Sequence, residues 1–204
     1  MTRRLVPLAG LAIVAMIVAT PFAYRSWASV RYRNLRVVEP ETLYRSGQMT
    51  QVGFERFVKE HGIKTVISLR DTKDEGKEPP DKAEADFCKA HGIMHYRLSP
   101  AKWSVDEDGT VPATKNVQEF MRIVRENPTA KPILIHCFAG IHRTGAHVAV
   151  YRMECNGWSR EQAIEEMKSM GTSRTTFDDD LIDFIESYTP NRQAKPVGDT
   201  APRR

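Results

Sequence analysis

Cysteine is scarce in this sequence, which has three in 204 residues, at Cys88, Cys137 and Cys155. Their odd number and wide spacing exclude the disulfide framework of a small secreted domain. At least one thiol is therefore expected to be free. Cys88 and Cys155 fall within amphipathic stretches that suit buried structural cysteines, whereas Cys137 lies in a segment of different character.

Acidic residues are absent from residues 1–36, which carry six arginines. Residues 190–204 carry four lysines or arginines against Asp199, so residues 37–189 hold 20 basic and 25 acidic groups. The formal net charge of +4 thus belongs to the two ends of the chain. A nucleic-acid-binding domain needs a basic face of its own, and this distribution argues against that function. It is typical of polar flanks beside a membrane or of a disordered tail.

Only one apolar run in the sequence is long enough to cross a membrane as a helix. Leu5–Ala23 contains no charged residue over nineteen positions, about the length of a helix that crosses a bilayer. We therefore expect residues 1–36 to form a single-pass membrane anchor followed by a basic linker. A cleaved signal peptide is the alternative, although Ser26-Trp27-Ala28 after Arg25 makes a poor cleavage site.

The arginines on either side of this run indicate an orientation. Two of them and the amino terminus precede the run, and four follow it, at Arg25, Arg31, Arg33 and Arg36. The positive-inside rule therefore favours, by a small margin, a domain on the cytoplasmic side. A free thiol also suits a reducing compartment.

Residues 37–189 have the length of one globular domain and alternate between two kinds of segment. Strand-like segments are 42–45, 64–69, 93–98 and 133–136, and helix-like segments are 50–61, 81–91, 113–127, 144–155, 159–170 and a last one from Thr176 or Asp178. This alternation predicts an α/β fold, in which a mostly parallel central sheet is covered by helices on both faces. Such sheets bind ligands at the carboxyl ends of their strands. Residues 190–204 have little apolar content and are expected to be disordered.

Three polar residues are expected to begin helices by accepting backbone N–H groups. Thr50 and Asp81 stand at helix starts, and Ser159 is followed three residues later by Gln162, which predicts a capping box. The first two helices both end in His-Gly-Ile, where glycine can adopt the left-handed conformation that ends a helix.

The segment with the clearest chemistry runs from His136 to Gly145, with the sequence His-Cys-Phe-Ala-Gly-Ile-His-Arg-Thr-Gly. It lies where a buried strand turns into a helix, so free backbone amides and the helix dipole converge on one anion-binding point. These groups favour the thiolate of Cys137, which becomes a nucleophile at neutral pH. Arg143, six residues on, can hold two phosphoryl oxygens through its planar fork of donors.

We also expect specific roles for the residues around Cys137 and Arg143. The five loop residues expected to bind the substrate are Phe138, Ala139, Gly140, Ile141 and His142. Gly140 permits close backbone approach, and the hydroxyl of Thr144 can donate to the sulfur or serve as an ordinary helix cap. We expect His136 to support the loop through hydrogen bonds and not to carry protons.

The His-Cys-(five residues)-Arg-Thr pattern resembles the signature of the protein tyrosine and dual-specificity phosphatase superfamily. Leu43–Gln48, Val66–Arg70 and Ala149–Met153 are also similar to compact bacterial members, so the resemblance covers about residues 40–188. It implies the cysteine-phosphatase fold. It also implies phosphoryl transfer to Cys137 followed by hydrolysis with water, without a metal or cofactor.

The same resemblance implies a general acid, normally an aspartate on a mobile loop ahead of the helix that precedes the cysteine strand. Trp103–Pro112 is that loop in this sequence. Asp108, four residues before Pro112 and next to a glycine, is our first choice, and Asp106 is the second. The loop lacks the Trp-Pro-Asp tripeptide of the family, and the alternative interpretation is a turn with solvated acids.

The five loop residues contain no lysine or arginine. Superfamily members that act on inositol phosphates resemble one another in carrying such cations in the loop, where they meet the added phosphates. We therefore expect the substrate to be a phosphorylated protein, with phosphotyrosine first, or a small aryl or alkyl phosphomonoester.

Two alternative functions share part of this pattern. A rhodanese-like sulfurtransferase also presents a cysteine loop with an arginine at the end of a strand, but Thr144-Gly145 and His136 argue against it. A pseudophosphatase would bind phosphate without turnover, and the intact Cys137 and Arg143 make it the lesser alternative. Four residues considered as metal ligands fit no common ligand spacing: His136, Cys137, His142 and His147.

Overall fold

The computed structural model describes residues 31–71, 76–126, 128–173 and 178–191, together with Met16, Ala19 and Thr20. Within this described part of the chain, no helix combines the length and apolar character that crossing a membrane requires. The predicted anchor, Leu5–Ala23, lies outside the described residues except at those three positions, and so does the predicted tail beyond residue 191.

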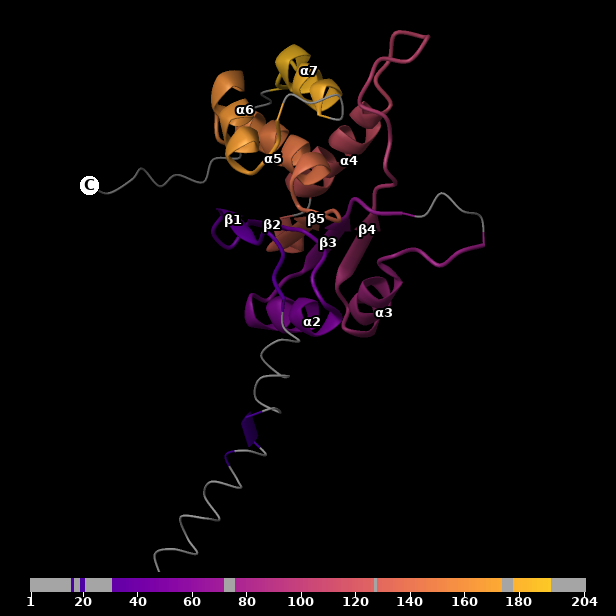
Figure 1. Cartoon of the computed structure of the whole chain (residues 1–204), viewed down its shortest axis with the longest axis vertical. Coiled ribbons are helices and arrows are strands. Elements are labelled where there is room, and N and C mark those ends of the chain that lie inside the picture. Colours follow the sequence, from indigo (N-terminus) through magenta and orange to yellow (C-terminus); the bar gives the residue numbers. More distant parts are fainter. Residues whose placement is uncertain are drawn as a thin grey trace, which may run out of the picture.

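The centre of the fold is a five-stranded sheet with the strand order β1-β2-β5-β3-β4 (Figure 1). Its strands are β1 (Arg36–Glu39), β2 (Leu43–Ser46), β3 (Thr65–Ser68), β4 (Met94–Arg97) and β5 (Ile133–His136). Strands β2 to β5 are parallel to their neighbours in the sheet, whereas β1 pairs antiparallel with β2 at one edge. The prediction of a mostly parallel sheet is confirmed, and β1 is an addition that the sequence pattern did not reveal.

The carboxyl ends of the four parallel strands are level with one another. Their last residues pair across the sheet in one row, Ser46 with His136, His136 with Ser68, and Ser68 with Arg97. The segments that leave these strands therefore start side by side at one rim of the sheet. This rim is where sheets of this kind bind ligands.

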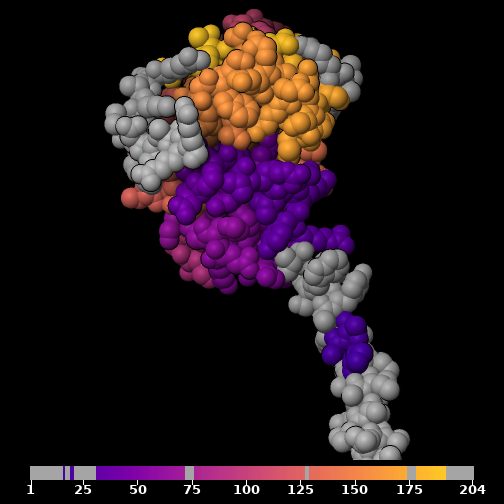
Figure 2. Space-filling view, turned by 90° about the vertical axis from the view of Figure 1, so that its left-hand side faces the viewer, coloured from indigo at the N-terminus to yellow at the C-terminus, as the bar shows by residue number. Residues whose placement is uncertain are grey.

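Helices cover both faces of the sheet (Figure 1). One face carries α2 (Gln51–Glu60) and α3 (Lys82–Ala90), and the other carries α4 (Ala113–Glu126), α5 (His142–Cys155), α6 (Arg160–Ser169) and α7 (Asp179–Ser187). A short 3-10 helix, Pro128–Ala130, leads into β5. In the space-filling view the indigo N-terminal residues and the orange to yellow C-terminal helices form adjoining layers (Figure 2).

The strands bury alternate side chains in two separate cores. Val66 and Leu134 pack with Phe54 beneath α2 and α3. Ile67 and Ile135 point to the opposite side and pack against the helices of the other layer. Because both faces of the sheet are covered, the strands are continuously apolar, which is the pattern that the sequence shows before Cys137.

Two of the three predicted helix caps are confirmed. Thr50 accepts a hydrogen bond from the first turn of α2, and Ser159 and Gln162 form the reciprocal capping box of α6. Asp81 precedes α3 but makes no capping hydrogen bond, so that expectation is wrong. Its buried carboxylate instead pairs with the guanidinium of Arg97 at 2.7 Å. A bidentate ion pair compensates a buried carboxylate more fully than a backbone amide does.

Candidate active site

Residues 137–141, which we call the Cys137 loop, join the end of β5 to the start of α5. Cys137 is 3% exposed, and the backbone N–H of Gly140 donates to its Sγ over 3.2 Å. A donor at this distance stabilises a sulfur anion more than a neutral thiol. Gly140 has a φ of +76°, a conformation that favours glycine, and the loop turns back on the sulfur at this residue.

The carbonyl groups of the loop are held from outside by the N-terminal part of the chain. Three consecutive carbonyls accept these bonds: Phe138 O from Gln48 N (2.9 Å), Ala139 O from Asn34 Nδ2 (2.8 Å) and Gly140 O from Arg45 Nη2 (2.9 Å). The C=O and N–H of a trans peptide point in opposite directions, so the amides of these peptides face away from the donors. The loop is thereby arranged to surround an anion.

Arg143 lies in the first turn of α5, and a hydrogen bond holds its guanidinium close to the strand ends. Nη1 donates to the carbonyl oxygen of Leu69, the residue after β3, over 2.5 Å. Cys137 and Arg143 line the same pocket, which has a volume of about 700 Å³. The structure therefore brings the predicted nucleophile and the predicted phosphate clamp together.

The pocket includes predicted and unpredicted residues. The predicted site residues that line it are Cys137, Phe138, Ala139, His142 and Arg143. Trp103, the first residue of the predicted acid loop, also lines it, and so do residues to which the sequence assigned no site role, among them Arg33, Arg70, Asp71, Ser99 and Asp180. Arg70, Asp71 and Ser99 follow the ends of β3 and β4, and the carboxyl-end rule applied to every strand would have found them. Arg33 and Asp180 gave no comparable signal in the sequence.

Three predicted site residues belong to the loop region without lining the pocket. Gly140 contributes its N–H to the sulfur, and Ile141 stands at the N-cap of α5 without a side-chain capping bond. Thr144 is buried, and its hydroxyl makes no hydrogen bond among the described residues. The expected bond from Thr144 to Cys137 is therefore absent in this conformation, in which the sulfur accepts the N–H of Gly140.

The two predicted general acids lie outside the pocket, on a loop that projects beyond α4 (Figure 1). Asp106 forms an ion pair with a lysine of the same loop at 3.3 Å. Asp108 accepts the hydroxyl and the backbone N–H of Thr110, at 2.7 and 2.9 Å, and these bonds lower the pKa of its exposed carboxyl. Two other carboxylates, Asp71 and Asp180, do line the pocket.

A sequence profile of the family described as DSP-PTPase phosphatase fused to NAD+ kinase matches residues 22–182. The chain belongs to this phosphatase family. The phosphatase is similar to OCA1 of Mycosarcoma maydis, a proposed tyrosine-protein phosphatase, with 31% identity over 139 residues. That alignment covers 66% of this chain and 78% of OCA1. The predicted superfamily and the predicted cysteine-dependent phosphatase activity are confirmed by these relationships.

Solved structures of phosphatases share the fold. TpbA from Pseudomonas aeruginosa matches with a TM-score of 0.59 and 25% identity, over 77% of this chain and 86% of TpbA. The core catalytic domain of the PP-IP phosphatase SIW14 from S. cerevisiae, in complex with citrate, matches with a TM-score of 0.58 and 27% identity. It covers 79% of this chain and 89% of that domain. The predicted α/β phosphatase fold is thus confirmed for the domain.

The mouth of the phosphatase's pocket carries two arginines from outside the Cys137 loop. Both lie near the ring of Phe138, which is 52% exposed. The guanidinium carbon of Arg33 is 4.3 Å from the ring centroid, and that of Arg70 is 5.3 Å away. Burial lowers the pKa of Arg70, and the charge of Arg143 acts in the same direction, but an arginine remains protonated in proteins. Arg33 and Arg70 therefore bring two positive charges to a pocket that the carboxylates of Asp71 and Asp180 also line.

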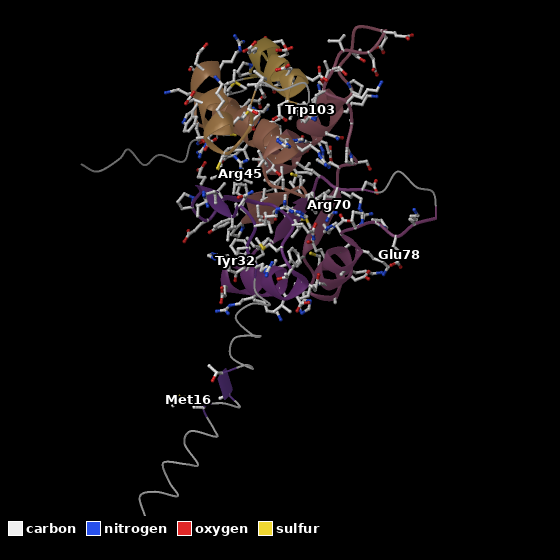
Figure 3. All side chains as sticks on the ribbon, in the orientation of Figure 1. Met16, Tyr32, Arg45, Arg70, Glu78 and Trp103 are labelled. Atoms are coloured by element: carbon white, nitrogen blue, oxygen red, sulfur yellow. The ribbon has the colours of Figure 1, made fainter. Side chains whose placement is uncertain are left out.

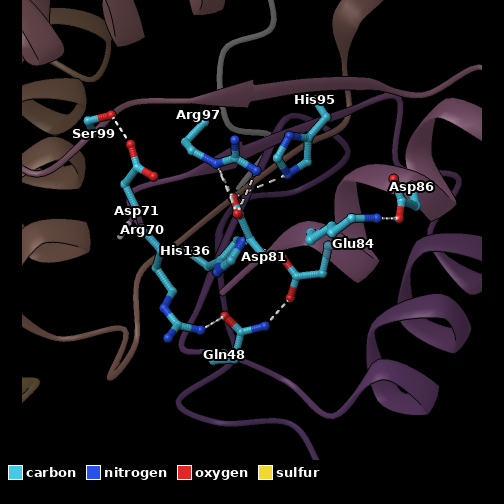
Figure 4. A network of polar contacts seen from close by, with 11 residues as sticks. Gln48, Arg70, Asp71, Asp81, Glu84, Asp86, His95, Arg97, Ser99 and His136 are labelled. Atoms are coloured by element: carbon cyan, nitrogen blue, oxygen red, sulfur yellow. Dashed lines mark hydrogen bonds and ion pairs between the residues drawn. The ribbon is translucent and has the colours of Figure 1, made fainter. Parts of the chain in front are cut away.

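A chain of polar contacts connects Arg70 to Gln48 and then to Glu84 (Figure 4). Arg70 donates to the side chain of Gln48, which in turn donates to Glu84. The other carboxylate oxygen of Glu84 lies 2.9 Å from Nε2 of His136, and both side chains are buried. Neither ring nitrogen of His136 makes a hydrogen bond among the described residues. The expected support of the loop through hydrogen bonds is therefore not seen, and the contact of His136 is with Glu84. Arg70 and Arg45 both lie between the two helical layers (Figure 3).

His147 supports the phosphatase's α5 from inside the core. Its Nδ1 donates to the carbonyl oxygen of Arg143 over 2.8 Å. The rings of Trp103 and Phe120 contact it edge to face, with centroid distances of 5.7 and 5.5 Å. Burial lowers the pKa of His147 to about 4. The imidazole is therefore neutral at physiological pH and acts as a donor to the backbone.

The other two thiols of the phosphatase lie outside the pocket. Burial raises the pKa of Cys88 to about 12, and burial also raises the pKa of Cys155. All three cysteines are free, and Cys137 is the one that lines the pocket. A thiol reagent at neutral pH should therefore react with Cys137 first.

Proposed function

We propose that this phosphatase hydrolyses phosphomonoesters by way of a phosphocysteine on Cys137, with phosphotyrosine proteins as the preferred substrates. One observation carries the proposal. The Sγ of Cys137 accepts the N–H of Gly140 in a pocket that Arg143 also lines. A thiolate nucleophile and a bidentate phosphoryl clamp need this arrangement.

In the first step, the thiolate of Cys137 attacks phosphorus and the bond from phosphorus to the leaving oxygen breaks. The amides of the Cys137 loop and the guanidinium of Arg143 hold the non-bridging oxygens, whose charge is the main electrostatic demand of the transition state. An aspartic acid donates a proton to the leaving oxygen. The products are the phosphocysteine and an alcohol or phenol.

In the second step, water attacks the phosphocysteine and gives its proton to the same aspartate. The bond from phosphorus to sulfur breaks, which releases inorganic phosphate and restores the thiolate. We propose that Thr144 donates its hydroxyl to the departing sulfur. The buried position of this hydroxyl, with no hydrogen bond described for it, supports that role.

For the general acid we propose Asp108, with Asp106 second, on a loop that closes over bound substrate. The loop begins at Trp103, which lines the pocket, so one end of it is already at the site. Asp71 and Asp180 are the alternatives, because they line the pocket without any closure. Replacing each aspartate by asparagine distinguishes these assignments.

The proposal is tested by metal-free hydrolysis of an aryl phosphate, with acid quenching and mass spectrometry to detect the phosphorylated peptide. We expect the parent to turn over and to show a phosphoryl group on Cys137. Cys137→Ser should be inactive, and Cys155→Ser, the matched control outside the pocket, should keep the parent rate. A parent without activity on any phosphomonoester would favour the sulfurtransferase or pseudophosphatase alternatives.

A second candidate substrate is a small molecule with several phosphates. The related SIW14 is a PP-IP phosphatase. The Cys137 loop has no lysine or arginine of its own, but Arg33 and Arg70 supply cations to the pocket from elsewhere. Rates on phosphotyrosine peptides and on inositol polyphosphates, measured side by side, decide between the two candidates. A strong preference for the polyphosphates would replace our first choice.

We also propose that Leu5–Ala23 anchors the phosphatase in a membrane, with the catalytic domain on the cytoplasmic side. The uncharged run of nineteen residues supports the anchor, and the four arginines after it support the orientation. Full-length protein should stay in the membrane pellet after alkaline extraction. A soluble protein whose amino terminus begins after Ala28 would instead indicate a cleaved signal peptide.

A further inference from the structure

Residues 31–35, which we call the N-terminal strap, precede β1 and are held along their whole length. Each strap residue has a partner in the domain. Three of them make hydrogen bonds: Arg31 N donates to Thr50 Oγ1 (3.2 Å), Arg33 O accepts the N–H of Gly47 (2.6 Å), and Asn34 Nδ2 donates to Ala139 O (2.8 Å). The other two make packing contacts, Tyr32 with Phe57 (centroids 6.1 Å) and Leu35 with the core beneath α2 and α3. Tyr32 lies beside α2 (Figure 3). These contacts fix the position of Asn34 against the Cys137 loop.

The backbone of Asn34 is in the left-handed region, with a φ of +47°. Few residues other than glycine adopt this conformation, and asparagine is among those that tolerate it. Backbone conformations of this kind persist where surrounding contacts enforce them. Here the enforced conformation places the side-chain amide on the carbonyl oxygen of Ala139, which is 105 positions away in the chain.

The carbonyl that Asn34 holds and the N–H that reaches the nucleophile belong to one peptide group. Its C=O, from Ala139, accepts the Asn34 amide at 2.8 Å. Its N–H, from Gly140, donates to Sγ of Cys137 at 3.2 Å. Because a peptide group is planar, fixing one end fixes the direction of the other. A donor on the carbonyl also polarises the N–H and strengthens its bond to the sulfur.

We infer that Asn34 is a positioning residue for the nucleophile: through the Ala139–Gly140 peptide it aims the N–H that stabilises the thiolate of Cys137. Asn34 itself does not touch the reacting atoms. It acts on the cysteine of the active site from a segment that lies upstream of the first predicted element of the domain.

Other titratable groups lie around the Cys137 loop and remain in place when Asn34 is changed. They come from the elements packed around it: Arg33 of the strap, Arg143, His142 and His136 beside the loop, Arg45 on β2, Arg70 and Asp71 after β3, Glu84 on α3 and Asp180 on α7. A change in thiol reactivity that follows substitution of Asn34 is therefore attributable to the peptide group and not to a lost charge.

The test uses full-length protein and the pH dependence of Cys137 alkylation by iodoacetamide, which needs no substrate. Asn34→Gly removes the amide but tolerates the left-handed backbone. We expect the alkylation midpoint to rise by roughly half to one pH unit and kcat/KM on an aryl phosphate to fall about five- to tenfold, mainly through kcat, as befits one lost hydrogen bond. Asn34→Asp, which cannot donate and adds a negative charge, should shift the midpoint further.

The matched control is Glu41→Gly. Glu41 also has a left-handed backbone, with a φ of 55°, and lies in the turn between β1 and β2, away from the loop. Like Asn34→Gly, it places glycine at a left-handed position, and it should keep the parent alkylation midpoint. If Asn34→Gly and Asn34→Asp keep the parent midpoint, whether or not their melting temperatures or activities fall, Asn34 is merely structural and the inference is wrong. A parent that is alkylated normally but hydrolyses no phosphomonoester would overturn the proposed function and leave this test intact.

Discussion

A β-carbon on Gly140 would lie 2.4 Å from the backbone nitrogen of Gly47, and one on Gly47 would lie 2.6 Å from the carbonyl oxygen of Ala139. The turn after β2 and the Cys137 loop therefore meet backbone to backbone, with no room for side chains between them. Beside this contact, the backbone N–H of Gln48 donates to the carbonyl oxygen of Phe138. Two glycines that are 93 positions apart in the sequence thus fix the shape of the phosphate-binding loop.

Gly140→Ala should damage both stability and catalysis. It combines the strain of a positive φ, about 1–2 kcal/mol, with a backbone clash that requires the loop to move. We expect the free energy of unfolding to fall by more than about 2 kcal/mol and kcat/KM to fall at least about 100-fold, because loop amides are displaced. Urea denaturation and aryl phosphate hydrolysis measure the two effects.

Gly157→Ala is the control for this substitution. Gly157 has a similar φ of +70°, but an added β-carbon would meet nothing within 4 Å. It should therefore show the strain alone, about 1–2 kcal/mol, with parent activity. Equal losses in the two variants would mean that the contact with Gly47 does not matter.

Asp108→Asn should lower turnover in a manner that depends on the leaving group. A lost general acid costs about 100-fold or more when the leaving group is basic, as in phosphotyrosine, and much less for nitrophenyl phosphate. Asp106→Asn is expected to show a smaller effect, since its carboxylate is our second choice. If Asp71→Asn or Asp180→Asn shows the leaving-group dependence instead, the acid is already in the pocket and no loop closure is needed.

His147 should make the protein less stable as the pH falls from about 6.5 to 4. Burial lowers its pKa to about 4 in the folded protein, whereas an unfolded histidine titrates near 6.5. The unfolded chain binds the proton more readily in this window, so stability is lost on acidification, by an amount on the order of 3 kcal/mol at the acid end. Thermal unfolding at several pH values measures the loss.

His147→Asn should flatten that pH dependence because it removes the titrating group and can keep a donor near the Arg143 carbonyl. His91→Asn is the matched control. His91 contacts the carbonyl oxygen four residues before it at 2.8 Å, as His147 does, but its side chain is exposed. An unchanged pH dependence in His147→Asn would refute the assignment to this residue.

Arg33→Ala and Arg70→Ala should weaken binding of substrates that carry a second negative charge. For a phosphotyrosine peptide with acidic neighbours, KM should rise about five- to tenfold, and less so at high salt, which screens exposed charges. A neutral peptide should be affected little. Arg36→Ala, which removes an exposed arginine of β1 that does not line the pocket, should leave both values unchanged. Equal effects on the two peptides would exclude a charge effect.

The sequence allowed the fold class and the core of the site to be predicted because both depend on local patterns. The apolar strand before Cys137, the spacing to Arg143 and the capping residues Thr50 and Ser159 are all short-range signals. Asp81 failed as a cap because it pairs instead with Arg97, which lies on β4, 16 positions away in the chain. The contact between Asn34 and Ala139 spans 105 positions, and no periodicity or motif indicates such a pair.

Because the N-terminal strap is fixed to the domain, it also limits the distance between the catalytic domain and the predicted membrane span. Eight peptide steps separate Ala23, the last residue of the predicted span, from Arg31. Fully extended, they reach at most about 29 Å. If the span crosses a bilayer, this short linker keeps the catalytic domain within roughly one domain diameter of the lipid headgroups. Substrates on the same membrane would then meet the enzyme at a far higher effective concentration than freely diffusing ones. The location of the enzyme would thus contribute to its substrate selectivity.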